Sequence, residues 1–307
     1  MKLKQALLPL VIAGLVTACI GGKRTTPSEE SSSLKAAFGN KFLIGAALNQ
    51  RQVSGEDTAA IAIAKHHFNS IVAENCMKCE VIHPEENRYN FTPADSLVDF
   101  GEENGMAVIG HCLIWHSQLA PWFCVDSAGK NVSPEVLKQR MKEHISTIVG
   151  RYKGRIHGWD VVNEACDESQ PDGLRNSYWY QIIGPDYLYY CFLYAREAEV
   201  LYSNQYASLY GLNPETDDLS SIQPKLFYND YNEWVVSRSD AIVHFLTEEP
   251  WNENHEKVTS PVIHPDGDGT IYGDGLIDGI GMQGHLDDTQ NIEQYMTCLL
   301  YTSPSPR

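Results

Sequence analysis

An amide and a carboxylic acid follow directly after an apolar stretch in the middle of the chain. Residues 156–162 are largely apolar and predict a short buried strand, and Asn163 and Glu164 stand at its C-terminal end. Polar side chains at such a place need partners or a function, because burying them without hydrogen bonds is costly. We interpret Glu164 as a general acid/base and Asn163 as its neighbour in the substrate pocket. On this segment alone, a carboxylate that stabilises the N-terminus of the following helix is an equal alternative.

Apolar stretches alternate with helical patterns along most of the chain. The predicted strands cover residues 42–47, 70–73, 106–110, 156–162, 225–228 and 277–282. The predicted helices cover residues 56–68, 93–103, 134–149, 186–201 and 237–246, and residues 202–224 and 248–275 are predicted to be inserted loops. Strands that are apolar on both faces and alternate with helices are typical of a parallel sheet covered by helices.

Polar side chains follow several of these predicted strands. They are Glu74 and Asn75, His111, Asn163 and Glu164, Asn229 and Asp230, and Gln283 with His285. In a parallel barrel the C-terminal ends of the strands meet at one face, where catalysis takes place. A doubly wound sheet is not expected to place functional groups after strand upon strand, and no Gly-x-Gly-x-x-Gly follows the first strand. The sequence therefore predicts an α/β protein with a (β/α)8 barrel, of which residues 38–297 hold about six of the eight strands.

The composition limits the classes of ligand. The chain of 307 residues has 43% hydrophobic residues and a formal net charge of -17, which argues against nucleic acid as a partner because phosphate binding needs a basic face. No metal is predicted, because the Cys76-x-x-Cys79 pair has no second pair at zinc-site spacing. No cofactor is predicted either, and the protein is expected to be a monomer.

The N-terminus resembles a bacterial lipoprotein signal. Lys2 and Lys4 precede an apolar run that is too short to span a membrane, and small residues precede Cys19. We predict a signal peptide over residues 1–19, lipid attached to Cys19, and a flexible linker over residues 20–37. The protein is then exported and held at a bacterial outer membrane or cell surface by its lipid alone. An ordinary signal peptide with an incidental cysteine is the alternative.

Read together, the motifs at the strand ends resemble glycoside hydrolase family 10, whose members are mostly endo-β-1,4-xylanases. The motifs are Glu74-Asn-Cys-Met-Lys-Cys-Glu80, Tyr89-Asn-Phe, Ala94-Asp95, Gly110-His-Cys-Leu-Ile-Trp-His-Ser-Gln118, Trp159-Asp-Val-Val-Asn-Glu164, Tyr228-Asn-Asp-Tyr-Asn232 and Asp278-Gly-Ile-Gly-Met-Gln-Gly-His285. Their order along the chain makes the resemblance specific, and it covers roughly residues 38–286. It favours a catalytic role for Glu164 over a carboxylate that only stabilises the N-terminus of the following helix.

The resemblance implies a retaining endo-β-1,4-xylanase that acts on xylan or xylo-oligosaccharides, with Glu164 as its acid/base. It also implies that Asn163 contacts the sugar 2-hydroxyl at the cleavage subsite, and that His111, Trp115 and Gln118 line that subsite. In retaining enzymes a second carboxylate lies roughly 5 Å from the acid and attacks the anomeric carbon directly.

The resemblance assigns further residues to the neighbouring subsites. It implies that Glu74, Asn75 and Lys78 form the adjoining subsite on the non-reducing side. It implies that Asn229 and Tyr231 lie on the leaving-group side.

The resemblance also places Gln283 near the catalytic centre and makes His285 the partner of the second carboxylate. That carboxylate itself is a Glu after the seventh strand in the family, and no matching motif follows His285. Residues 298–307 resemble a translated sequencing adapter, so we expect a non-native tail on a truncated barrel that folds poorly and is inactive as written. Re-sequencing the source gene past the codon for Thr297 tests this expectation. The alternatives are a non-catalytic glycan-binding lipoprotein and a related β-1,4-glucanase.

Overall fold

The structure is a computed structural model that describes residues 33–39, 41–219, 222–232, 235, 237–238, 277–285, 291–293 and 295–296. The predicted signal peptide with Cys19, most of the predicted linker, the predicted loop over residues 248–275 and the predicted tail over residues 298–307 lie outside these residues.

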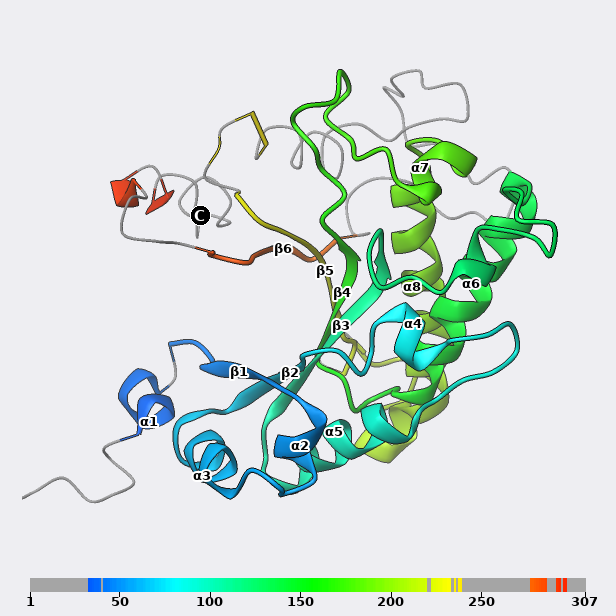
Figure 1. The fold of residues 1–307 in the computed structure, drawn as a ribbon. Coiled ribbons are helices and arrows are strands. Elements are labelled where there is room, and N and C mark those ends of the chain that lie inside the picture. The colour runs from blue at the N-terminus through cyan, green and yellow to red at the C-terminus, as the bar shows by residue number, and fades with distance from the viewer. Residues whose placement is uncertain are drawn as a thin grey trace, which may run out of the picture.

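The described strands form one parallel sheet in which neighbours in sequence are neighbours in space. The strands are β1 (Gly45–Leu48), β2 (Ser70–Ala73), β3 (Ala107–Trp115), β4 (Gly158–Asn163), β5 (Lys225–Asp230) and β6 (Gly279–Met282), in the order β1-β2-β3-β4-β5-β6. The sheet curves, and helices cover its outer side (Figure 1). This arrangement is an incomplete (β/α)8 barrel, so the predicted fold is confirmed.

Helices lie before the first strand and between successive strands from β1 to β5, where parallel pairing requires a crossover connection. They are α1 (Leu34–Phe38), α2 (Gln50–Val53), α3 (Thr58–His67), α4 (Cys79–Ile82), α5 (Thr92–Glu103), α6 (Pro134–Arg151), α7 (Tyr178–Ile183) and α8 (Tyr187–Tyr206), with 3₁₀ turns at Pro121–Phe123 and Ala207–Tyr210. Helix α6 begins where its sequence indicates, because Ser133 accepts a hydrogen bond from the backbone N–H of Val136 and Pro134 occupies the first helical position.

Three predicted boundaries differ from the structure by three residues or more. Strand β3 continues past Gly110 to Trp115, because residues 112–114 are buried and extend the apolar strand beyond the polar His111. Helix α8 continues to Tyr206 into the predicted loop, because Ser203 and Tyr206 pack inward. The first strand begins at Gly45, since the preceding apolar residues 42–44 lie before the sheet pairing starts.

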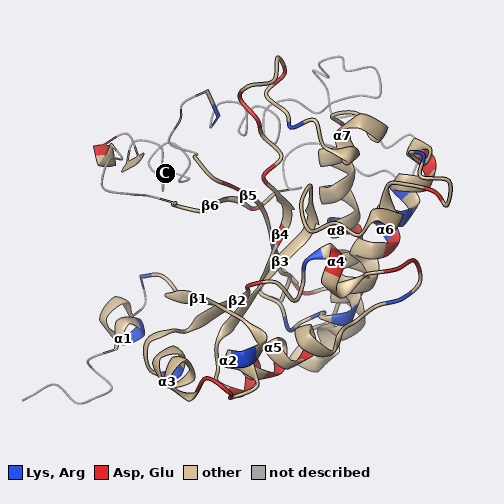
Figure 2. Ribbon diagram, viewed as in Figure 1, with Lys and Arg blue, Asp and Glu red and all other residues tan. Residues whose placement is uncertain are grey.

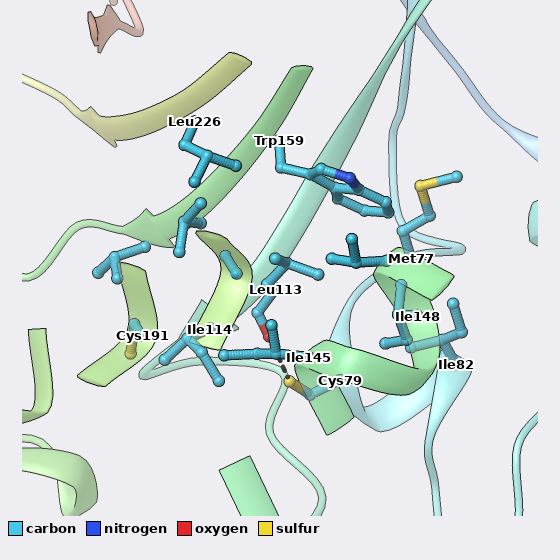
Figure 3. Packing of buried hydrophobic residues seen from close by; sticks show 14 of the residues in the cluster. Met77, Cys79, Ile82, Leu113, Ile114, Ile145, Ile148, Trp159, Cys191 and Leu226 are labelled. Carbon is cyan, nitrogen blue, oxygen red and sulfur yellow. Dashed lines mark hydrogen bonds between the residues drawn. The ribbon is translucent and has the colours of Figure 1, made fainter. Parts of the chain in front are cut away.

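The core lies between the sheet and the helices that cover it. Figure 3 shows side chains of α4, α6 and α8 packed against Leu113, Ile114, Trp159 and Leu226 of strands β3, β4 and β5. Gly110 allows this packing, because a Cβ at that position would lie 2.1 Å from the ring of Trp159. The core therefore fixes β3 and β4 against each other just below the residues that follow them.

Charged residues gather outside the sheet, on helices and loops (Figure 2). Asp160, Lys225 and Asp230 are the charged residues within the six strands. Two of them are buried: Asp160 in the middle of β4, and Asp230 at the C-terminal end of β5. In the described part of the chain, no helix has the length and apolar character that crossing a membrane requires.

Candidate active site

Glu164 directly follows β4 and receives a hydrogen bond on each carboxyl oxygen. Trp115 Nε1 donates to Oε2 at 3.0 Å, and Gln283 Nε2 donates to Oε1 at 2.9 Å. The backbone of Glu164 is left-handed, with φ 57°, a conformation that costs a non-glycine residue about 1–2 kcal/mol. A strained backbone at a carboxyl group held from two sides is typical of a functional site.

Three residues next to Glu164 are brought into one row by the strand register. Trp115 pairs with Asn163, and Asn163 pairs with Asn229, across strands β3, β4 and β5. Asn229 Nδ2 and Gln283 Nε2 lie 2.9 and 3.1 Å from the side-chain amide of Asn163. The amide that lies beside the Glu164 carboxyl group is therefore contacted by a residue of β5 and by the residue that follows β6.

A second group of polar residues lies beside Trp115, in the loops after β2 and β3. Lys78 Nζ donates to Gln118 Oε1 at 2.8 Å and to Asn75 Oδ1 at 3.0 Å, and it lies 4.9 Å from the centroid of the Trp115 ring. Asn75 also donates to Glu74 at 3.4 Å. An ammonium, amides and a carboxylate around an aromatic ring can bind the hydroxyl groups and the flat apolar face of a sugar.

The remaining predicted site residues reach the same end of the sheet. His111 Nδ1 lies 2.8 Å from Asp160 Oδ2, and the His111 ring is 6.5 Å from that of Trp115. His285 Nε2 lies 2.9 Å from Gln283 Oε1. Tyr231 is joined to Glu164 through Arg175, as described next. The structure thus brings together every predicted site residue except Cys19, which lies outside the described residues.

Three residues of the site were missed by the sequence reasoning. Asp160 holds His111, and its signal was a charged residue in the middle of an apolar strand. Glu80 accepts from Gln118 Nε2 at 3.2 Å and stood within a quoted motif. Arg175 donates to Glu164 O at 2.9 Å and to Tyr231 Oη at 3.0 Å, and nothing in its local sequence indicated this.

Beneath the site, between α4, α6 and β3, lies a buried pair of histidines. His83 Nδ1 and His144 Nδ1 are 3.1 Å apart, and His144 Nε2 lies 3.0 Å from Leu113 O. Burial lowers the pKa of His83 to about 4 and that of His144 to about 3. Both rings are therefore neutral near pH 7, and they belong to the packing beneath the site.

The described cysteines carry free thiols, and most are buried. Burial raises the pKa of Cys76 to about 11 and holds that of Cys79 well above its ordinary value. Among the described residues, no cluster of three or more His, Cys, Asp or Glu side chains could hold a metal ion.

Comparison with known proteins agrees with this geometry. A family model described as "Glycosyl hydrolase family 10" matches residues 33–303. The chain is 40% identical over 221 residues to endo-1,4-beta-xylanase A of Xylanibacter ruminicola. The aligned region covers 72% of this chain and 53% of the relative. It is 37% identical over 259 residues to endo-1,4-beta-xylanase B of Paenibacillus barcinonensis, with 84% of this chain and 64% of the relative covered.

Solved structures show the same likeness. A psychrophilic glycoside hydrolase family 10 endo-beta-1,4-xylanase superposes with a TM-score of 0.68 at 33% identity, over 88% of this chain and 71% of the other. The chain spans about half the length of the Xylanibacter relative and 21% of endo-1,4-beta-xylanase A of Thermotoga maritima. From the family match and the shared fold, the chain belongs to glycosyl hydrolase family 10.

Proposed function

We propose that the protein is a retaining endo-β-1,4-xylanase in which Glu164 is the general acid/base. The observation that carries the proposal is the carboxyl group of Glu164, which is held at 3.0 and 2.9 Å by Trp115 and Gln283 beside the Asn163 amide. The named relatives are endo-1,4-beta-xylanases, which supports xylan as the substrate class.

In this reaction Glu164 acts twice. It gives its proton to the glycosidic oxygen while a second carboxylate attacks the anomeric carbon, so the leaving sugar departs as an alcohol and a glycosyl ester forms. Glu164 then takes a proton from water, whose oxygen displaces the ester and restores the second carboxylate. The hydrogen bonds that the described residues make to Glu164 and His285 involve no second carboxylate. We assign that role to no described residue.

The lining of the site supports a neutral sugar chain as the ligand. Hydrogen-bond donors and acceptors form a connected group next to the Trp115 ring. They belong to Glu74, Asn75, Lys78 and Gln118. We propose that this group binds the sugar on the non-reducing side of the cleaved bond, and that Asn229 and Tyr231 bind on the leaving-group side.

The test is made on the printed chain and on the complete product of its gene. Xylohexaose and xylan are incubated with each protein, the products are separated by chromatography, and the anomer first formed is identified by proton NMR. For the complete gene product we expect internal cleavage with the β-anomer formed first, and a loss of at least 100-fold in its Glu164→Gln variant, because general acid–base catalysis contributes about 10²–10⁴-fold. For the 307-residue chain we expect no cleavage. Cleavage of carboxymethylcellulose in preference to xylan supports the glucanase alternative.

Binding measurements separate an enzyme from a glycan-binding protein. Calorimetry with xylohexaose is run on the wild type and on Glu164→Gln. Binding by both proteins with no cleavage by any form of the wild type supports the non-catalytic alternative and contradicts the proposal.

We also propose that Cys19 carries lipid and anchors the protein to a membrane. Small residues precede it after an apolar run, which supports the proposal. Labelling cells with radioactive palmitate should mark the wild type and leave Cys19→Ser unlabelled. A labelled Cys19→Ser variant contradicts the assignment.

A further inference from the structure

Every backbone N–H from residue 164 to 166 has a hydrogen-bond acceptor from strand β5. Glu164 N donates to Asn229 O at 2.8 Å. Ala165 N and Cys166 N both donate to the hydroxyl of Tyr228, at 3.0 and 3.1 Å. Two successive N–H groups on one side-chain oxygen fix the direction in which the chain leaves Glu164.

The three carbonyl groups of the same segment are bound as well, chiefly by arginine. Arg175 Nε donates to Glu164 O at 2.9 Å, Arg175 N donates to Ala165 O at 2.7 Å, and Arg175 Nη2 donates to Cys166 O at 3.2 Å. Arg238 Nη2 donates to Cys166 O at 2.9 Å. A guanidinium presents its donors in a rigid planar arrangement, so the Arg175 side chain fixes the carbonyls of Glu164 and Cys166 relative to one another.

The side chains that bind the backbone of residues 164–166 make further hydrogen bonds and ion pairs with one another and with their neighbours. Arg238 is only 2% exposed and forms ion pairs with Asp230 at 2.7 Å and with Glu168. The Tyr228 hydroxyl donates to the other oxygen of Asp230. Arg175 Nη2 donates to Tyr231 Oη at 3.0 Å. Such a connected network keeps its members in one arrangement.

The left-handed backbone of Glu164 needs such support. A residue with φ 57° does not hold this conformation by its own preference, because its Cβ is crowded there. The direction of the Glu164 side chain follows from that backbone, since its Cα–Cβ bond is fixed by φ and ψ. The segment around residue 164 thus decides whether the carboxyl group reaches Trp115 and Gln283.

We propose that Arg175 and Tyr228 are positioning residues for the acid/base. By binding the backbone of residues 164–166 they hold Glu164 in its left-handed conformation and direct its carboxyl group to Trp115 Nε1 and Gln283 Nε2. The proposal rests on the proposed function of Glu164. It predicts that loss of either residue moves the carboxyl group even though neither side chain touches it.

The indole N–H groups provide a measurement that does not depend on turnover. Trp115 Nε1 donates to Glu164 Oε2, whereas Trp122 Nε1 donates to His83 O at 3.1 Å, away from the acid. In ¹⁵N NMR spectra, Glu164→Ala defines the position of the Trp115 indole resonance without its partner. We expect Arg175→Met and Tyr228→Phe each to shift the Trp115 indole resonance from its wild-type position at least half of the way to its position in Glu164→Ala. The Trp122 resonance should stay at its wild-type position.

Two control variants match the substitutions away from the site. Arg155→Met removes an arginine that pairs with Asp99 and Glu102. Tyr206→Phe removes the hydroxyl of a buried tyrosine that donates to Ile222 O at 3.3 Å. Both should leave the Trp115 resonance unmoved. If folded Arg175→Met and Tyr228→Phe proteins also leave it unmoved, the proposal is overturned.

Kinetics with two leaving groups give a second readout. Xylan needs a proton on its leaving oxygen, whereas a 2,4-dinitrophenyl xylobioside does not, because dinitrophenolate leaves unaided. We expect Arg175→Met and Tyr228→Phe to lose about tenfold more activity on xylan than on the dinitrophenyl substrate, since only the former depends on the general acid. Equal losses on both substrates overturn the proposal. A complete gene product that cleaves neither substrate contradicts the proposed function instead, and the NMR result then decides the positioning role.

Discussion

Trp115 donates its indole N–H to Glu164 across 3.0 Å, and this contact joins the two groups of the site. The face of the same ring lies 4.9 Å from Lys78 Nζ, and the Trp115 carbonyl accepts from Trp179 Nε1 at 3.0 Å. Trp115 is therefore held between Glu164, the polar group around Lys78 and helix α7. A change at Trp115 should affect acid catalysis and binding together.

Replacing Trp115 with Phe keeps an aromatic face and removes the N–H that Glu164 Oε2 accepts. Such a hydrogen bond contributes about 0.5–1.5 kcal/mol net, so we expect kcat/KM on xylan to fall by about 2–10-fold. Steady-state kinetics measure the loss. Trp122→Phe is the matched control, because its N–H donates to His83 O outside the acid site, and a similar loss there would contradict the assignment.

Replacing Lys78 with Met keeps the length of the side chain and removes the donors to Gln118 and Asn75. We expect the dissociation constant for xylo-oligosaccharides to rise about tenfold, which corresponds to about 1.4 kcal/mol. Isothermal titration calorimetry measures it. Lys65→Met is the control, because Lys65 also lies over an aromatic ring, that of Phe100, but outside the site. Unchanged affinity in Lys78→Met would remove this residue from the binding group.

The buried His83 and His144 should make folding sensitive to acid. Their pKa values are lowered from 6.5 to about 4 and about 3, so between about pH 6.5 and pH 4 the unfolded chain binds protons that the folded chain does not. Stability is then lost as the pH falls through this window. In urea unfolding, His83→Gln should gain up to about 2 kcal/mol relative to the wild type between pH 7 and pH 5. A pH-independent difference between the two proteins contradicts the prediction.

Glu199 on α8 should have the opposite effect on stability from the two histidines, and lower it as the pH rises. Its carboxyl group is buried beside Arg196 at 2.6 Å, and burial outweighs the arginine and raises its pKa from 4.5 to about 7. The folded state holds this proton more tightly, so its contribution to stability is lost as the pH rises from about 4.5 through 7. We expect Glu199→Gln to gain about 1–3 kcal/mol over the wild type between pH 5 and pH 8. Glu197→Gln, which removes a half-buried carboxylate of the same helix that pairs with Lys142 at 2.9 Å, is the matched control variant.

Much of the fold was predictable because apolar runs and strand ends are local properties. Strand β2 has the predicted boundaries, and Asn163 and Glu164 do stand at the end of β4. The boundaries of β3 and α8 were wrong because burial by distant residues extends both elements beyond their local patterns. Local sequence could not reveal that Arg175, in a loop 11 residues beyond Glu164, folds back to its carbonyl. Such contacts depend on the path of the loop in three dimensions.

The in-register row of Trp115, Asn163 and Asn229 restricts how the chain can change in length during evolution. A single residue inserted or deleted within β4 would turn Asn163 to the opposite face of the sheet and break the row, since side chains alternate along a strand. A change of length in the loop between β4 and α7 leaves that register untouched. Among natural homologues, insertions and deletions should therefore fall in the loops after the strands, while the spacing within each strand stays constant.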